Sequence, residues 1–286
     1  HANIDLSNIK GFVGTSVGAL ASLALILGLK SSDIHEVMSP MLASLRNVAP
    51  HLDISLLIRD YGLDDGNALR AAVKNMLRKG GLSDESTFKD MRRLLRRDLI
   101  CCATNLETRK HVFLGADTTP DLHVYEGVFM SMCVPFLFAP VQFNNGLYVD
   151  GSLSMDVPEY YPAEETLFLR FDIKGIREKI VSWNEYIEAV FACGIECQNK
   201  QSAEFMGKSE CIIMSVPECL MNGSALNLDL HYSAIRQLIA CGYSSGLCYI
   251  YPNFMSTVES VLMMVIAAVV NLRHSSEYDE PYNPIL

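Results

Sequence analysis

One short stretch near the start of the chain, Gly14-Thr15-Ser16-Val17-Gly18, constrains the fold more than any other feature. The apolar run Ile9–Gly14 predicts a buried strand, and the Ala- and Leu-rich run after Ser16 predicts a helix closed by Gly28. A serine between small residues, with a strand before it and a helix after it, is typical of a nucleophile elbow. In such a turn Gly14 and Gly18 would remove side chains that clash. A plain glycine turn is the alternative interpretation.

The chain supplies its own control for this pattern. Gly242-Tyr243-Ser244-Ser245-Gly246 has the same spacing of glycine and serine, but it follows a predicted helix over 228–241 rather than a strand. Gly242 is therefore predicted to cap that helix. The context, and not the pattern, favours Ser16 as the nucleophile.

The residue that would accept the proton of Ser16 is harder to predict. None of the seven histidines lies in an obvious loop at a strand end, and His274, near the C-terminal tail, is the single histidine candidate. Asp150 ends a predicted strand and precedes Gly151, which lets the backbone turn sharply. Active sites of open α/β sheets collect at such strand ends. Asp-Gly is also common in ordinary turns, as at Asp65-Gly66 of this chain.

Elsewhere the pattern alternates between strands and helices, which predicts an α/β architecture with a mainly parallel sheet. We expect one domain over 1–272 and a polar tail over 273–286. The predicted strands span 9–14, 99–106, 110–115, 139–143, 147–151, 166–173 and 211–217. The predicted helices span 16–28, 31–38, 64–81, 83–98, 183–206, 228–241 and 256–272.

Composition narrows the classes of function. The net charge of −10 argues against nucleic acid as the main partner, because a phosphate binder usually carries a basic face. The nine cysteines show no zinc-like spacing and predict reduced thiols in a cytosol-like compartment. The apolar run Val261–Val270 is shorter than the ~18 residues that span a bilayer. It predicts a buried helix, with a dimer face or a membrane-docking face as alternatives.

Five segments, taken in order, resemble the patatin-like phospholipases and lipid acyl hydrolases. The match covers nearly the whole chain, and the joint order is more specific than any single motif. The segments are GTSVGAL (14–20), CATNLETRKHVFLG (102–115), TPDLHVYEGVFMSMCVPFLFAPV (119–141), LYVDGS (147–152) and ALNLDLHYSAIRQLIACGY (225–243).

This resemblance implies a three-layer α/β/α sandwich and a Ser–Asp dyad without a histidine. Ser16 would attack an ester carbonyl and Asp150 would act as the general base, with Gly14, Gly18 and Gly151 shaping the turns. It also implies a glycerolipid or phospholipid substrate, no metal or organic cofactor, and transient contact with a membrane surface. We expect a cytoplasmic protein, peripheral at membranes, that could form oligomers through its apolar C-terminal helix.

The chain also departs from the family pattern. A glycine-rich loop normally precedes the elbow strand and supplies oxyanion donors, whereas this chain begins at His1. We therefore expect the native protein to extend upstream, with an apolar strand and such a loop. Ser152 stands where Gly or Ala is usual and Asp156 where Asn is common, and we expect neither to touch the dyad directly.

Two alternatives to the Ser–Asp hydrolase stay open at this point. One is a catalytically silent protein of the same fold that serves in binding or assembly, and the other is a Ser-Asp-His esterase. Four arginines also form rows on one predicted helix, which indicates a solvated face or contact with anionic lipid headgroups. They are Arg92, Arg93, Arg96 and Arg97.

Overall fold

The structure is a computed structural model that describes residues 8–30, 32–34, 36–38, 40, 54–173, 180, 183–216, 240–242, 244–246 and 249. The chain divides into two compact units, which we describe separately. The larger unit comprises Asn3–Ala163 and Val181–Lys208, and the smaller comprises His1–Ala2, Glu164–Ile180 and Ser209–Leu286. The predicted helix over 256–272 and the tail lie outside the described residues, and the single domain over 1–272 stays a prediction.

A five-stranded sheet forms the centre of the larger unit, in the order β1-β3-β7-β6 with β4 also paired to β3. Its strands are β1 (Gly11–Thr15), β3 (Asp98–Asn105), β4 (Lys110–Leu114), β6 (Val141–Phe143) and β7 (Gly146–Asp150). β1 is parallel to β3, and every other pair in this sheet is antiparallel. The expected α/β fold is present, but this sheet is mixed rather than mainly parallel.

Two hairpins cause that difference. Tight connections join β3 to β4 and β6 to β7, and strands joined so closely must run antiparallel. Asn144 and Asn145, at the second turn, both have positive φ angles, of 45° and 61°. Asparagine tolerates this left-handed backbone better than most residues, so the Asn-Asn pair favours a tight hairpin turn.

The register of β3 explains how two distant segments meet. β4 occupies one edge of β3 along Cys101–Asn105, so β1 and β7 must share the other edge. β1 ends at Thr15, opposite Cys102, and β7 ends at Asp150, opposite Ala103. Because β7 runs antiparallel to β1, the carboxyl ends of these two strands face each other.

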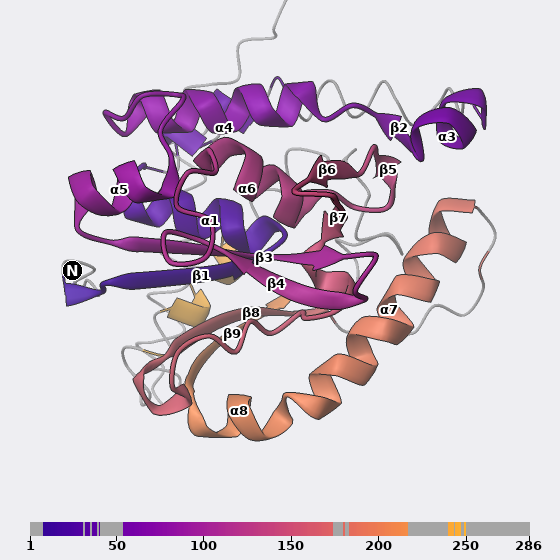
Figure 1. The fold of residues 1–286 in the computed structure, drawn as a ribbon. Coiled ribbons are helices and arrows are strands. Elements are labelled where there is room, and N and C mark those ends of the chain that lie inside the picture. Colours follow the sequence, from indigo (N-terminus) through magenta and orange to yellow (C-terminus); the bar gives the residue numbers. More distant parts are fainter. Residues whose placement is uncertain are drawn as a thin grey trace, which may run out of the picture. The chain divides into compact units, whose positions relative to one another are not determined.

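Helices cover this sheet, and α1, α4, α5 and α6 lie on one side of it in Figure 1. The apolar side chains that α1, α5 and α6 bury pack against β1 and β3 and form the core. The remaining pieces of the larger unit include the short parallel pair β2–β5 and helix α7, which contacts η2. The bounds are α1 (Val17–Ile26), α3 (Ile54–Asp60), β2 (Gly62–Asp64), α4 (Asn67–Lys79), α5 (Phe88–Leu95), α6 (Val124–Met132), β5 (Phe136–Phe138), η2 (Gly151–Leu153), η3 (Ala163–Glu165), α7 (Trp183–Gln201) and α8 (Ala203–Lys208).

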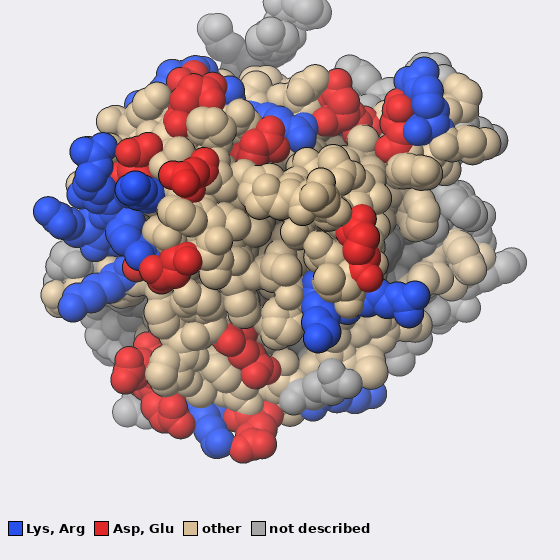
Figure 2. All heavy atoms as spheres, in the orientation of Figure 1, with Lys and Arg blue, Asp and Glu red and all other residues tan. Residues whose placement is uncertain are grey.

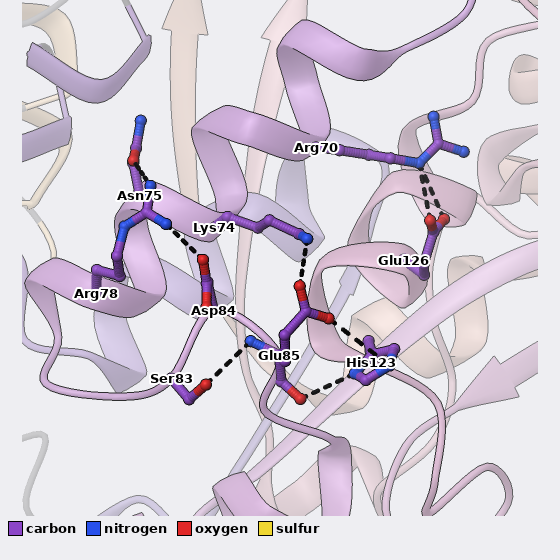
Figure 3. A network of polar contacts seen from close by, with 9 residues as sticks. All are labelled: Arg70, Lys74, Asn75, Arg78, Ser83, Asp84, Glu85, His123 and Glu126. Carbon is purple, nitrogen blue, oxygen red and sulfur yellow. Dashed lines mark hydrogen bonds and ion pairs between the residues drawn. The ribbon is translucent and has the colours of Figure 1, made fainter.

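A polar network fixes the start of α6 against α4 (Figure 3). Arg70 of α4 donates to Glu126 of α6 at 2.9 Å, and its guanidinium also stacks on the ring of Phe129. Glu85, in the loop between α4 and α5, accepts from Lys74 and bonds through its carbonyl to His123, which precedes α6. These contacts hold the helix whose last turn reaches the site described below.

The smaller unit contains the parallel pair β8 (Leu167–Ile173) and β9 (Glu210–Val216), both close to their predicted ranges. Residues 240–242 and 244–246 are helical, whereas residues 228–239 and 243 lie outside the described residues, so the predicted cap at Gly242 stays a prediction. Ser244 lies in helical backbone. Across the helices that the structure describes, none is both long and apolar enough to cross a membrane.

Candidate active site

Ser16 occupies the sharp turn between β1 and α1, as the sequence predicts. Its backbone has φ 55° and ψ −129°, a conformation that non-glycine residues rarely adopt. α1 begins at the next residue, Val17, and Ser16 makes no side-chain capping bond to it. The hydroxyl is therefore free of the usual N-cap role and is available to a partner across the sheet.

That partner is Asp150. Ser16 Oγ donates a hydrogen bond to Asp150 Oδ2 at 2.6 Å, across 134 residues of sequence. The two side chains meet because β1 and β7 lie along the same edge of β3 and their carboxyl ends face each other. The structure thus unites the two residues that the sequence singled out for the catalytic pair.

A buried serine that sequence reasoning missed holds the backbone of this turn. The Ser16 N–H donates to Ser131 Oγ at 3.0 Å, and the Ser131 hydroxyl donates to the Cys102 carbonyl at 2.6 Å. Ser131 lies in the last turn of α6 and is fully buried. A lone serine in the apolar run VFMSMCV is the signal that could have indicated this role.

Asp150 is buried, at 2% exposure, and its other carboxylate oxygen is also bonded. Oδ1 accepts from the Ser152 N–H at 2.9 Å and from Ser152 Oγ at 2.7 Å. The expectation that Ser152 does not touch the pair is therefore wrong, because the sharp turn at Gly151 folds Ser152 back onto the carboxylate. The Asp150 N–H donates to the Cys133 carbonyl at 2.8 Å, which fixes the end of β7 against the end of α6.

Burial and hydrogen bonding change the pKa of the Asp150 carboxyl group in opposite directions. Loss of solvent is the largest effect and raises the pKa of Asp150 above its usual value. The hydrogen bonds from Ser16 and Ser152 lower the pKa and offset part of that rise, and the nearby charge of Asp156 adds to it. A carboxylate with a raised pKa is a better proton acceptor than an ordinary aspartate.

Gln198 of α7 braces the segment that follows Asp150, and no pattern in the sequence pointed to it. Its side-chain amide donates to the carbonyls of Ser152, at 3.3 Å, and Leu153, at 2.9 Å. Its side-chain oxygen accepts from the Asp156 N–H at 2.9 Å. One side chain therefore restrains the residues that carry the Ser152 contact to the carboxylate.

The glycines of the two turns differ in what they do. A Cβ on Gly14 would lie 2.3 Å from the backbone N of Ala19, and one on Gly151 would lie 2.2 Å from the carbonyl oxygen of Cys102. Backbone atoms cannot yield as a flexible side chain does, so both positions need glycine. A Cβ on Gly18 would meet nothing within 4 Å. The predicted steric role therefore holds for Gly14 and fails for Gly18, which faces open space.

This contrast predicts opposite effects of two matched substitutions. Gly14→Ala should lower the free energy of unfolding by about 1–3 kcal/mol, the usual cost of overpacking. Gly18→Ala should leave it unchanged or raise it by up to about 1 kcal/mol, because alanine favours a helix more than glycine does. Urea unfolding of both variants measures the difference. A loss for Gly18→Ala as large as that for Gly14→Ala would contradict this account of the turn.

Other candidate nucleophiles and bases in the described part of the chain are engaged elsewhere or stay protonated. Burial raises the pKa of both Cys102 and Cys133 to about 12, so these thiols stay protonated at neutral pH. His111 packs its ring against Phe113, and His123 belongs to the network of Figure 3. His274 lies outside the described residues. Within the part of the chain that the structure describes, no cluster of His, Cys, Asp or Glu could hold a metal ion.

Comparison with known proteins identifies the family. The family model described as patatin-like phospholipase matches residues 3–162, more than half of the chain. The chain belongs to the patatin-like phospholipase family. The matched residues of this patatin-like chain include both Ser16 and Asp150.

Two viral proteins and one solved structure are similar to this chain. The patatin-like chain is 25% identical over 255 residues to the uncharacterized protein R571 of Acanthamoeba polyphaga mimivirus, covering 85% of this chain and 83% of R571. It is 25% identical over 159 residues to the probable lipid hydrolase 463L of invertebrate iridescent virus 6, covering 54% of this chain and 53% of that protein. The crystal structure of VipD from Legionella pneumophila matches its fold with a TM-score of 0.50 and 15% identity. That match covers 85% of this chain and 61% of VipD.

Proposed function

We propose that this chain hydrolyses ester-linked fatty acids of glycerolipids through a Ser16–Asp150 dyad. The observation that carries the proposal is the 2.6 Å hydrogen bond from Ser16 Oγ to a buried carboxylate at a strained strand-to-helix turn. Membership in the patatin-like phospholipase family, and the name of the iridescent virus relative, support a lipid as substrate.

The first half of the reaction forms an acyl-enzyme. Ser16 Oγ attacks the ester carbonyl carbon while Asp150 Oδ2 accepts the hydroxyl proton, which leaves a tetrahedral intermediate with a negative oxygen. The bond to the alcohol oxygen then breaks, and Asp150 returns the proton to that leaving oxygen. The fatty acyl group is now an ester of Ser16, and the lysolipid alcohol departs.

The second half repeats these steps with water. Asp150 accepts a proton from a water molecule that attacks the acyl carbonyl, and then returns it to Ser16 Oγ as the acyl–oxygen bond breaks. A free fatty acid leaves and the dyad is restored. The N-terminus of α1 begins at Val17, beside the reacting carbonyl, and its dipole favours the negative charge that develops there.

The products of a phospholipid test this proposal. We expect the protein to release a free fatty acid and a lysophospholipid from phosphatidylcholine, as thin-layer chromatography or mass spectrometry would detect. Release of the phosphorylated headgroup would contradict acyl ester cleavage. No release from any glycerolipid would instead favour a catalytically silent protein of the same fold.

The pH profile should reflect Asp150. Because the dyad needs the carboxylate and burial raises its pKa, kcat/KM should fall on the acid side with a midpoint above 3.8, the ordinary value for aspartate. Ser152→Ala removes a hydrogen bond that lowers this pKa, so its acid midpoint should move to higher pH. Initial rates on a soluble ester across the acid range measure both midpoints. A midpoint that Ser152→Ala leaves unmoved or lowers would argue against Asp150 as the base.

A further inference from the structure

Large apolar side chains are exposed around the Ser16–Asp150 pair. Val17 directly follows Ser16 and is 56% exposed, and Leu153, three residues after Asp150, is 38% exposed. Leu106 lies three residues after Ala103, the partner of Asp150 in the sheet, and is 39% exposed. Three residues span at most about 11 Å, so Val17 and Leu153 lie close to the reacting groups, and Leu106 lies further away by about one strand spacing.

Two exposed aromatic side chains extend this surface. Phe136 comes three residues after Cys133, whose carbonyl binds the Asp150 N–H, so it too lies within about 11 Å of that contact. Tyr61 precedes Gly62, which pairs with Phe136 in the β2–β5 ladder. Tyr61 is 63% exposed and Phe136 is 46% exposed.

Both aromatic residues stand in unfavourable backbone conformations. The φ angle is 59° at Tyr61 and 69° at Phe136, a region that bulky residues enter only as clear outliers. Each residue in such a conformation lowers the stability of the folded state by on the order of 1–3 kcal/mol. Glycine or asparagine would suit these positions better, so folding stability does not explain why two exposed aromatic rings occupy them.

Two cations stand beside this apolar surface. Arg109 and Lys110 form the tip of the β3–β4 hairpin, close to Leu106. Lys110 pairs with Asn105, which lies two residues along β3 from Ala103, the partner of Asp150. Both side chains are exposed, and neither takes part in an ion pair with any residue that the structure describes. Glu107, in the same turn, is engaged by the Leu147 N–H at 2.7 Å. The two cations outnumber this one carboxylate, so the tip carries a net positive charge next to the exposed side chain of Leu106.

We propose that this face docks on the surface of a bilayer that contains anionic phospholipids. The docking face comprises Val17, Tyr61, Leu106, Arg109, Lys110, Phe136 and Leu153. The aromatic and aliphatic side chains enter the interfacial layer, where tyrosine in particular is favoured, and the two cations contact anionic headgroups. The proposal rests on the proposed lipid hydrolase function, and it explains how a buried dyad would meet an aggregated substrate.

Binding to vesicles of ether-linked phospholipids tests the face without any hydrolysis, because these lipids lack the ester bond. The double variant Tyr61→Asn/Phe136→Asn should bind these vesicles at least about tenfold more weakly, because it has lost the two aromatic side chains that transfer from water into the bilayer. Its thermal stability should not fall, because asparagine tolerates positive φ. Unchanged vesicle affinity in this folded variant would overturn the proposal.

The cations give an independent variant with a close control. Arg109→Asn should weaken binding about fivefold on vesicles that contain phosphatidylserine and have little effect on pure phosphatidylcholine. Arg96→Asn is the control, because Arg96 is also an exposed arginine with φ 56° but precedes β3 at the opposite end. Figure 2 shows Lys and Arg gathered on the side of this view where α5, and with it Arg96, lies. An equal loss for Arg96→Asn would assign binding to that basic region instead.

Vesicle binding and ester hydrolysis, measured separately, distinguish a failure of the docking face from a failure of the proposed function. If wild-type protein bound the ether vesicles as described but released no fatty acid from ester lipids, the function would fail and the docking face would stand. If wild-type protein hydrolysed a soluble ester but bound no vesicle, the docking face would fail and the function would stand. A dimer in solution that Tyr61→Asn/Phe136→Asn dissociates would assign the face to a second copy of the chain and overturn the proposal.

Discussion

Ser16→Ala should abolish fatty acid release while leaving the fold intact. The substitution removes only the Oγ atom, so the acyl-enzyme cannot form. Loss of a serine nucleophile in a protease lowers kcat on the order of 10⁶-fold, and we expect a loss of comparable size here. Alanine fits the same turn, and the bond from the backbone N–H to Ser131 does not depend on the side chain. Fatty acid release and the melting temperature, measured together, check both halves of this expectation.

Ser244→Ala is the matched control for that variant. Ser244 has the same G-x-S-x-G neighbourhood in the sequence, but it lies in helical backbone in the structure. Its removal should leave hydrolysis unchanged. Hydrolysis that survives in Ser16→Ala and disappears in Ser244→Ala would reverse the assignment of the nucleophile.

Asp150→Asn should lower kcat/KM by about 10²- to 10⁴-fold, the usual contribution of a general base. Asparagine has nearly the same shape, and its side-chain oxygen can still accept from the Ser152 N–H and Oγ, but it cannot take the proton of Ser16. Initial rates on a soluble ester measure the loss. A variant with near wild-type rates would exclude Asp150 as the base and favour a histidine, such as His274, in that role.

The same substitution should change stability with pH in a defined direction. The folded-state pKa of Asp150 is raised, so the wild-type protein is stabilised by this group at low pH and loses that contribution as pH rises through the folded-state pKa. The melting temperature of Asp150→Asn relative to wild type should therefore increase from below pH 3.8 to neutral pH. A relative melting temperature that falls over this range would contradict the raised pKa.

Much of this site could be predicted because its signals are local. The strand, small residues and helix around Ser16 lie next to one another in the chain, and Asp150-Gly151 ends a short apolar run. The second hairpin also has clear turn residues, Asn144-Asn145-Gly146. Such local patterns can be recognised without knowing which segments meet in space.

What could not be predicted depends on contacts between distant segments. Ser131 acts by bridging the turn to β3, and Gln198 acts from α7 on residues more than forty positions away. The strands β2 and β5 have three residues each, too few for a period to be recognised. The antiparallel pairing of β7 with β3, which no hairpin joins, depends on which edge of β3 each strand occupies, and no single segment encodes that choice.

The most direct test of the Ser16–Asp150 account is to map the adduct of a serine-directed fluorophosphonate by peptide mass spectrometry. We predict a single adduct on Ser16 in wild-type protein, and much slower formation of that adduct in Asp150→Asn, because the neutral amide cannot accept the hydroxyl proton. An adduct on another residue, or labelling of Ser16 at the same rate in Asp150→Asn, would contradict the account.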